Sequence, residues 1–298
     1  MNKFAPVFII FAAILWGIDG IVLRPSLNAL PVSIVVFTES IIVSIYLFPI
    51  LLKDFALVKK LNLIDWLSFI GVALFGGVIG ILAITKALFY VNFVNLSIVI
   101  LIQKLQPVFA IAFAVFLLKE KLHKQFILWS SLAIAGAYIM AFGFSIPDIS
   151  TDNKTFMAAM FSLLAAFSFG LSTVLSKRAL QNSNFKLATY LRYILSSIFM
   201  FAIVIFYGET NLVSSFSNSQ IITFFLIAFT TGGPAMFIYY YGLKYTSASS
   251  STILELAFPL TAILLEYFLR GNILDIVQWF GVIILFVSIG KVSKLNIS

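Results

Sequence analysis

The chain has 298 residues, of which 62% are hydrophobic and only 10% are charged. Soluble globular proteins carry about 25% charged residues, so this composition excludes a set of soluble domains and predicts a multi-pass protein of the cell inner (plasma) membrane. The net charge of +8 does not indicate a nucleic-acid partner, because the basic residues lie in short segments between apolar runs, where they set membrane topology.

Ten apolar runs are long enough to cross a bilayer as helices, which takes about 20 residues each. They cover residues 4–23, 32–52, 64–90, 96–118, 126–144, 156–176, 187–207, 221–243, 249–269 and 276–291. The third run is unusually long, and the glycines at 76, 77 and 80 predict a bend within it.

The positive charges alternate between the two ends of these runs. Lysines and arginines gather in the loops at residues 53–60, 119–124 and 177–186 and in the C-terminal tail. The opposite loops hold only Arg24, Lys154 and Arg270. Because cytoplasmic loops are enriched in Lys and Arg, we predict that both termini are cytoplasmic.

The two halves of the chain repeat each other across the polar link at 145–155. Ala12–Arg24 matches Ala165–Lys177, and the FGGVIG stretch near Phe75 matches TGGPAM near Thr231. Each copy has five spans, an odd number, so the second copy enters the membrane upside down. The predicted fold is an all-α membrane protein of two inverted five-helix repeats, residues 1–146 and 147–298.

Several motifs resemble one known family. They are LWG at 15–17, KALFY at 86–90, YGLKY at 241–245, and the pair QPVFAIAFAVFLLKEKL at 106–122 and FPLTAILLEYFLRGNIL at 258–274. With these motifs the chain resembles the drug/metabolite transporter superfamily, in particular the ten-helix proteins built from two EamA-type repeats. The resemblance implies a central cavity lined by the first four helices of each repeat, with the fifth and tenth helices peripheral.

Two polar, proline-broken helices stand in matching places of the two halves. Gln103 lies four residues before Pro107, as Glu255 lies four residues before Pro259. Such paired interruptions are the usual sequence indication of a transporter's binding site. We therefore predict that the solute binds between these two breaks.

Lys104, Gln103 and Gln106 supply the polar groups of the first break. A lysine at a helix centre costs about 2.5–3.5 kcal/mol on insertion scales, which favours a position facing water or a carboxylate. Lys104 could bind an anionic group or release a proton, or form a structural ion pair. The two glutamines would bind solute or a neighbouring helix. Glu255 would accept an amine or a proton, or neutralise Lys104.

Aromatic residues Trp16, Tyr239 and Tyr240 are predicted to wall the substrate site, although aromatics near span ends also serve as interface anchors.

Three further charged residues are candidates for coupling or gating. Glu39 and Arg192 occupy equivalent places in the second and seventh spans, which allows a salt bridge that is either permanent or re-formed between states. Asp19 is a candidate proton or cation site, and the alternative is a pair with Arg24.

No motif indicates an enzyme or a primary pump. The chain has no GxxxxGK[ST] loop, no HExxH motif and no cysteine, so no cofactor or metal site is predicted. We predict a secondary transporter, proton-coupled or exchanging, for a small polar or amphipathic metabolite. An amino acid or related compound is favoured as the solute, and export as the direction. The predicted protein is a monomer or homodimer in contact with lipid. The alternatives are a flippase for a lipid-linked intermediate and a non-transporting membrane subunit.

Overall fold

The computed structural model describes residues 4–90, 99, 102–144, 153–271 and 273–295, and this part of the chain contains helices and no strand. In the first half these are α1 (Ala5–Ile18), the π-helical turn η1 (Asp19–Leu23), the 3-10 turn η2 (Arg24–Leu27), α2 (Val32–Val58), α3 (Leu63–Gly71), the π-helical segment η3 (Val72–Ile79), α4 (Gly80–Tyr90), α6 (Gln106–Leu118) and α7 (Lys124–Phe142). In the second half they are α8 (Asn153–Ala179), α9 (Phe185–Phe206), the 3-10 turn η4 (Thr210–Ser215), α10 (Asn218–Ile227), the π-helical turn η5 (Ala228–Gly232), α11 (Gly233–Tyr245), α12 (Ala248–Leu254), α13 (Ala257–Arg270) and α14 (Ile276–Val292).

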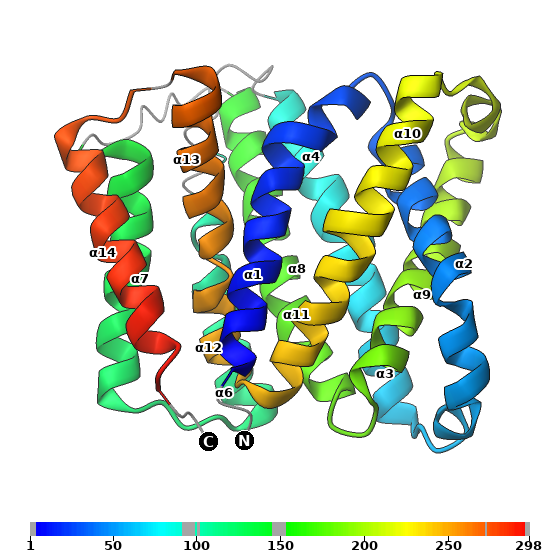
Figure 1. Ribbon diagram of the computed structural model, residues 1–298, viewed down its shortest axis with the longest axis horizontal. Helices are drawn as coiled ribbons and strands as arrows, with labels where there is room; N and C mark the ends of the chain where they lie inside the picture. Colours follow the sequence, from blue (N-terminus) through cyan, green and yellow to red (C-terminus); the bar gives the residue numbers. More distant parts are fainter. Residues whose placement is uncertain (1–3, 91–98, 100–101, 145–152, 272, 296–298) are drawn as a thin grey trace.

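These elements confirm the predicted set of membrane helices. Within the described residues, eight helical stretches are long and apolar enough to cross a membrane, and the shorter apolar helices α6 and α14 complete the predicted ten. Most of the predicted run before Ile102 lies outside the described residues. The two chain ends lie on the same face of the molecule (Figure 1), as an even number of crossings requires. The assignment of that face to the cytoplasm stays a prediction.

Local sequence signals explain where several helices begin. α3, α10 and α14 each start with a capping box, in which a polar side chain and the residue three positions later exchange hydrogen bonds with each other's backbone N–H groups. The pairs are Asn62 with Asp65, Ser217 with Gln220, and Asp275 with Gln278.

A π-helical segment, η3, lies where the glycines of the third span predict a bend. Gly76 and Gly77 lie in η3, where a Cβ atom at either residue would come within 2.2 Å of Ser172 Oγ or 2.3 Å of Ser196 Oγ. The glycines therefore let the third span wedge between α8 and α9. The matching helix of the second repeat has its own π-helical turn, η5, at the corresponding place.

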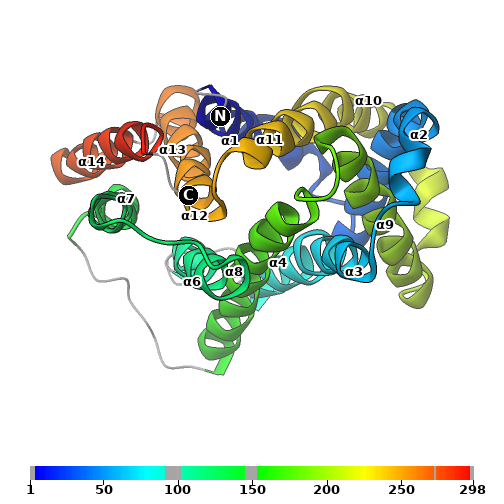
Figure 2. The same ribbon diagram turned by 90° about the horizontal axis from the view of Figure 1, so that it is seen from below.

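The helices α7 and α14 form a separate pair at one edge of the molecule (Figures 1 and 2), as the family resemblance implies for the fifth and tenth spans. Their contact depends on glycines. A Cβ atom on Gly281 would lie 2.3 Å from the backbone nitrogen of Met140, and one on Gly136 would lie 2.8 Å from that of Leu285. The two backbones are therefore in direct contact, which only glycine permits.

Gly281→Ala is expected to lower the free energy of unfolding by about 1–3 kcal/mol, because backbone atoms cannot move aside as a flexible side chain can. The matched control is Gly290→Ala on the same helix, where nothing lies within 4 Å of the added methyl group. That variant should be neutral or more stable by up to about 1 kcal/mol, since alanine favours helix. Denaturant titration in detergent measures both, and equal stability of the two variants would contradict the close contact.

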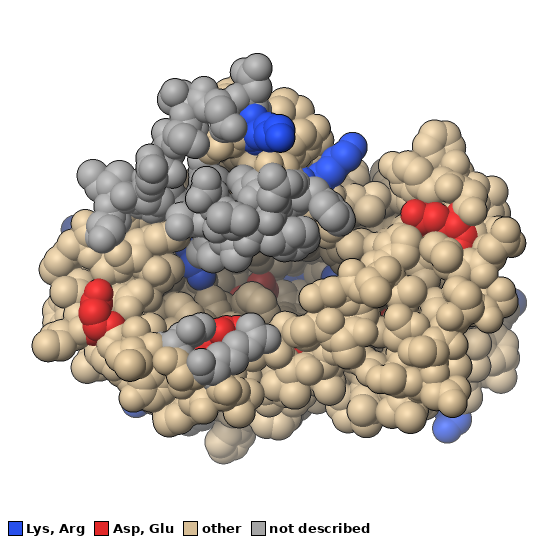
Figure 3. Space-filling model, turned by 90° about the horizontal axis from the view of Figure 1, so that it is seen from above, with Lys and Arg blue, Asp and Glu red and all other residues tan. Residues whose placement is uncertain are grey.

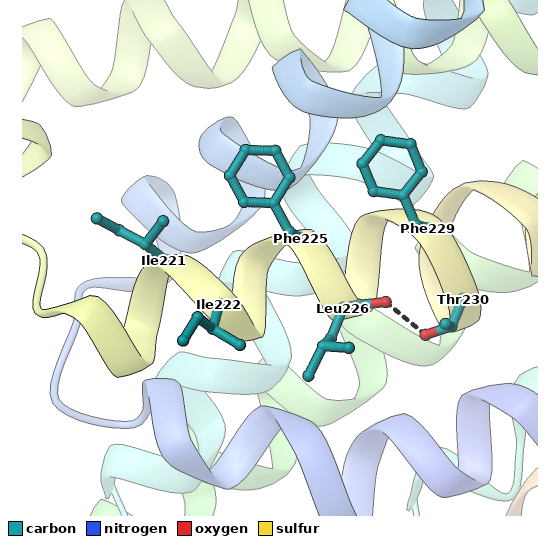
Figure 4. A pocket seen from close by; sticks show the side chains of 6 residues that line it. All are labelled: Ile221, Ile222, Phe225, Leu226, Phe229 and Thr230. Carbon is teal, nitrogen blue, oxygen red and sulfur yellow. Dashed lines mark hydrogen bonds between the residues drawn. The ribbon is translucent and has the colours of Figure 1, made fainter.

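A shallow apolar groove runs along α10 and η5 on the outer surface (Figure 4). It is lined by Ile221, Ile222, Phe225, Leu226, Phe229 and Thr230. The hydroxyl of Thr230 donates to the backbone oxygen of Leu226 at 2.5 Å, so this polar group is satisfied within its own helix. Such a surface suits contact with lipid and offers no charged group for a solute.

Candidate functional site

The face opposite the termini is hollowed near its middle, and both acidic and basic side chains are visible inside the hollow (Figure 3). The sequence predicts buried charges around a solute passage. The candidate site is therefore built from the charged and polar residues near the two helix breaks.

Glu255 stands at the break between α12 and α13. It ends α12, and Leu256 begins the next helix, so the chain makes a tight turn between them. The N–H of Glu255 still donates to Ser251 at 2.9 Å, and its carbonyl accepts from Phe258 at 2.9 Å. Pro259 lacks an N–H and therefore favours an interrupted helix here. The interruption places a carboxylate inside the membrane span Ala248–Leu269.

Two side chains hold this carboxylate. The hydroxyl of Tyr239 donates to Glu255 Oε1 at 2.6 Å, and the amide of Gln106 donates to Oε2 at 3.3 Å. Gln106 comes from the first repeat and Glu255 from the second, so this contact joins the two broken helices across the internal symmetry.

The ion pair between Lys104 and Glu255, offered as one role for these residues, is not present. Lys104 and Leu105 form the turn that precedes α6, and this turn directs Gln106 toward Glu255. Among the described residues Lys104 makes no hydrogen bond or ion pair, and the Gln103 amide nitrogen is buried without a partner. These two side chains therefore have donors that no described residue uses.

Trp16 and Tyr239 form an aromatic corner beside Glu255. Their ring centroids are 5.1 Å apart with the planes tilted by 53°. Tyr240, predicted alongside them, is fully buried at 0% exposure and lies against Ser176, whose hydroxyl is 3.0 Å from its own. Tyr240 therefore supports the site from behind and does not line it.

Arg192 belongs to the central site and not to an ion pair with Glu39. Its side chain lies close enough to Tyr240 and Glu255 for its positive charge to act on both. Gly76 leaves room for this group, since a Cβ atom there would lie 3.3 Å from an Arg192 nitrogen. The permanent Glu39–Arg192 pair, one of the two predicted alternatives, is thus wrong, and a pair that re-forms in another state stays a prediction.

Glu39 instead pairs with Arg24, which also binds Asp19. Arg24 Nη2 lies 2.6 Å from Asp19 Oδ2 and 3.3 Å from Glu39 Oε2. Thr231 donates to the other oxygen of Asp19 at 3.2 Å. The π-helical turn η1 explains the geometry, because residues five apart come together in a π-helix but not in an α-helix. The predicted alternative for Asp19, a pair with Arg24, is confirmed.

One partner in this region has no signal in the sequence. Thr231 is a single hydroxyl in an apolar helix, and no pattern marks it as a partner of Asp19. The bond of Arg24 to Glu39 depends on η1, which has no reliable sequence signal.

Comparisons with known proteins agree with the fold. Residues 3–142 and 156–293 match the EamA-like transporter family. The chain is 43% identical over 295 residues to the riboflavin transporter ImpX of Fusobacterium nucleatum subsp. nucleatum, covering 96% of each protein. A solved crystal structure superposes with a TM-score of 0.77 at 16% identity, over 98% of this chain and 96% of that one, which shows a shared fold.

The two family matches cover most of the chain, and the relative spans nearly all of it. The protein is therefore a multi-pass membrane transporter and not an enzyme, and it belongs to the EamA-like transporter family.

Proposed function

We propose that this protein transports riboflavin or a close analogue that keeps the isoalloxazine ring. The observation that carries the proposal is the 43% identity, over 96% of both chains, to a protein named as a riboflavin transporter. This relative does not support the amino acid favoured by the sequence analysis, and a flavin takes its place here. The broader expectation of a small amphipathic metabolite includes a flavin.

The aromatic corner suits the flat part of such a solute. Isoalloxazine is a fused, planar ring system, and ring contacts add about 0.5–1.5 kcal/mol beyond buried area. Trp16 and Tyr239 meet at 5.1 Å, and Tyr239 is fixed by its hydrogen bond to Glu255. A rigid aromatic pair of this kind can receive a planar ring at little entropic cost.

The polar groups suit the edge of the same ring, which carries two carbonyls around an N–H. Glu255 is an acceptor for that N–H. Gln103 and Lys104 have donors with no partner among the described residues, and these can meet the carbonyls. This arrangement uses both charge signs of the site for a solute that is itself neutral.

Transport by this site follows from the inverted repeats. The solute would bind between the two helix breaks while the halves rock around it, exposing each face in turn. The Gln106–Glu255 contact joins the halves and would change as they move. Proton coupling, exchange and the direction of net flux, for which the sequence favours export, remain part of this proposal.

Counterflow in proteoliposomes tests the solute without assuming a direction. Vesicles preloaded with unlabelled riboflavin are diluted into labelled riboflavin, and labelled solute should accumulate transiently. Protein-free vesicles are the control. The same assay with an amino acid mixture, unlabelled inside and labelled outside, tests the amino acid solute that the sequence favours. Absence of flavin counterflow, with the protein shown to be folded, would overturn the proposal. Accumulation of an amino acid would replace it.

A further inference from the structure

The region between Glu255 and the face that carries the termini is closed by α12. This short helix lies in the half of the molecule nearest the termini (Figure 1), and all seven of its residues are buried. It packs against α6, α8, α1 and α14. The opposite face of the molecule is hollowed (Figure 3).

The buried residues of α12 are unusually polar. Ser249, Ser250 and Thr252 are at most 2% exposed, and their hydroxyls have no hydrogen-bond partner. Only Ser251 is satisfied, through the carbonyl of Ser247 at 2.7 Å. A buried polar group without a partner costs about 1–3 kcal/mol, so three on one short helix form a considerable penalty in this state. Such a penalty in one conformation is expected where a second conformation of the transporter supplies hydrogen-bond partners for these hydroxyls.

A carboxylate from the other repeat holds the start of this helix. Glu120 accepts hydrogen bonds from the backbone N–H groups of Ala248 at 2.7 Å and Ser249 at 3.0 Å, one on each oxygen. The preceding residue, Lys119, adopts a left-handed backbone with φ of 57°, which is uncommon for a residue with a side chain and directs Glu120 toward α12. The corresponding residue of the second repeat is Gly271, which adopts the same conformation without strain.

A second set of hydrogen bonds holds the end of the neighbouring helix, α11. The Lys177 ammonium donates to the carbonyls of Leu243 at 2.8 Å and Lys244 at 2.9 Å, at the end of α11. The Lys244 ammonium in turn donates to the carbonyl of Ser183 at 2.5 Å. Charged side chains thus bind both ends of the α11–α12 connection.

We infer that α12 is the gate on the terminus side, held shut by Glu120, and that its unpartnered hydroxyls line the solute passage once the gate opens. Hydroxyls both donate and accept, so the passage suits a polyhydroxylated solute. The proposed gate rests on alternating access, one part of the proposed function, and does not depend on which solute is carried. The proposal that the solute is polyhydroxylated rests on riboflavin as the solute, because riboflavin carries a ribityl chain.

Cysteine labelling tests the gate on a clean background, because the chain contains no cysteine. Ser250→Cys is exposed to a membrane-impermeant maleimide in everted and right-side-out vesicles. Lys294→Cys, on the exposed tail, identifies the terminus face. The single variant Ser250→Cys should react slowly with the maleimide. When Glu120→Gln is added, the labelling rate from the terminus face should rise about tenfold or more, because a hydrogen bond to a charged group is worth about 1.5–3 kcal/mol.

Two controls separate gating from general loosening. The first control is Ser288→Cys. Ser288 lies on peripheral α14, is 1% exposed and has an unpartnered hydroxyl, so it matches Ser250 in burial and chemistry. Its labelling should not respond to Glu120→Gln. Lys121→Gln, an exposed charge in the same loop, should not accelerate Ser250→Cys. An unchanged rate at Ser250 with Glu120→Gln, or an equal rise at Ser288, would overturn the gate.

The passage has its own test. In the double variant Ser250→Ala/Thr252→Val, thermal stability should rise because two unsatisfied hydroxyls are removed. Riboflavin counterflow should fall several-fold, and counterflow of lumiflavin, which lacks the ribityl chain, should be unchanged. Undiminished riboflavin counterflow would overturn the proposal that these hydroxyls line the solute passage. If the parent protein moves no flavin, the proposed solute fails, and the labelling experiment still decides the gate.

Discussion

Glu255→Gln is expected to lower solute counterflow by about 10- to 100-fold in a protein that still folds. The substitution keeps the size of the side chain and removes the charge that Tyr239 and Gln106 bind at 2.6 and 3.3 Å. Hydrogen bonds to charged groups are worth about 1.5–3 kcal/mol, and loss of one such contribution to solute binding gives this range. Initial rates in proteoliposomes, normalised to the amount of folded protein, measure the effect.

Asp275→Asn is the matched control for this variant. It removes a carboxylate charge at an exposed position and keeps a good helix cap for α14, so counterflow should not change. Tyr239→Phe should give an intermediate loss, because the ring remains beside Trp16 while one donor to Glu255 is gone. Normal counterflow in Glu255→Gln would exclude this carboxylate from the solute site.

Arg24→Gln is expected to lower the free energy of unfolding by about 3 kcal/mol. Breaking a buried ion pair typically costs about 3–5 kcal/mol, because the remaining charge is left uncompensated. Here two carboxylates would remain, with side chains 8% exposed for Asp19 and 13% for Glu39. The lower end of the range applies because the Arg24 side chain is 40% exposed and partly screened. Denaturant titration in detergent measures the change.

Neutralising the whole cluster should recover most of the lost stability. The triple variant Arg24→Gln/Asp19→Asn/Glu39→Gln leaves no unpaired charge, so it should be clearly more stable than Arg24→Gln alone. Lys154→Gln removes an exposed positive charge and should have no measurable effect. A triple variant less stable than the single one would show that Arg24 acts through packing and not through charge.

The broken helices show how far the sequence could lead. A polar residue four positions before proline, repeated in both halves, predicted the place of the site, and the structure brings Gln106 and Glu255 together there. The hydrogen-bond partners of the individual polar side chains at the two breaks were less predictable. Residues 103 and 106 share an edge in a continuous helix, but the turn at Lys104 and Leu105 separates them.

The charged pairs show a second limit. Equivalent places in two repeats suggested a bond between Glu39 and Arg192. Yet a pseudo-symmetric position specifies neither rotamer nor local helix type, and the π-helical turn η1 brings Arg24 to Asp19 and Glu39 first. Arg192 then remains for Tyr240 and the central site.

By itself, the sequence determined the number of membrane helices, the repeat and the positions of both helix breaks. These follow from hydrophobicity over about 20 residues, from charge in the loops and from proline chemistry, all of which are local properties of the chain. The tertiary structure decided which charges pair, which tyrosine donates to Glu255, and that Glu120 binds the start of α12. Those outcomes depend on side chains far apart in sequence meeting at distances of about 3 Å, and no local pattern encodes such distances.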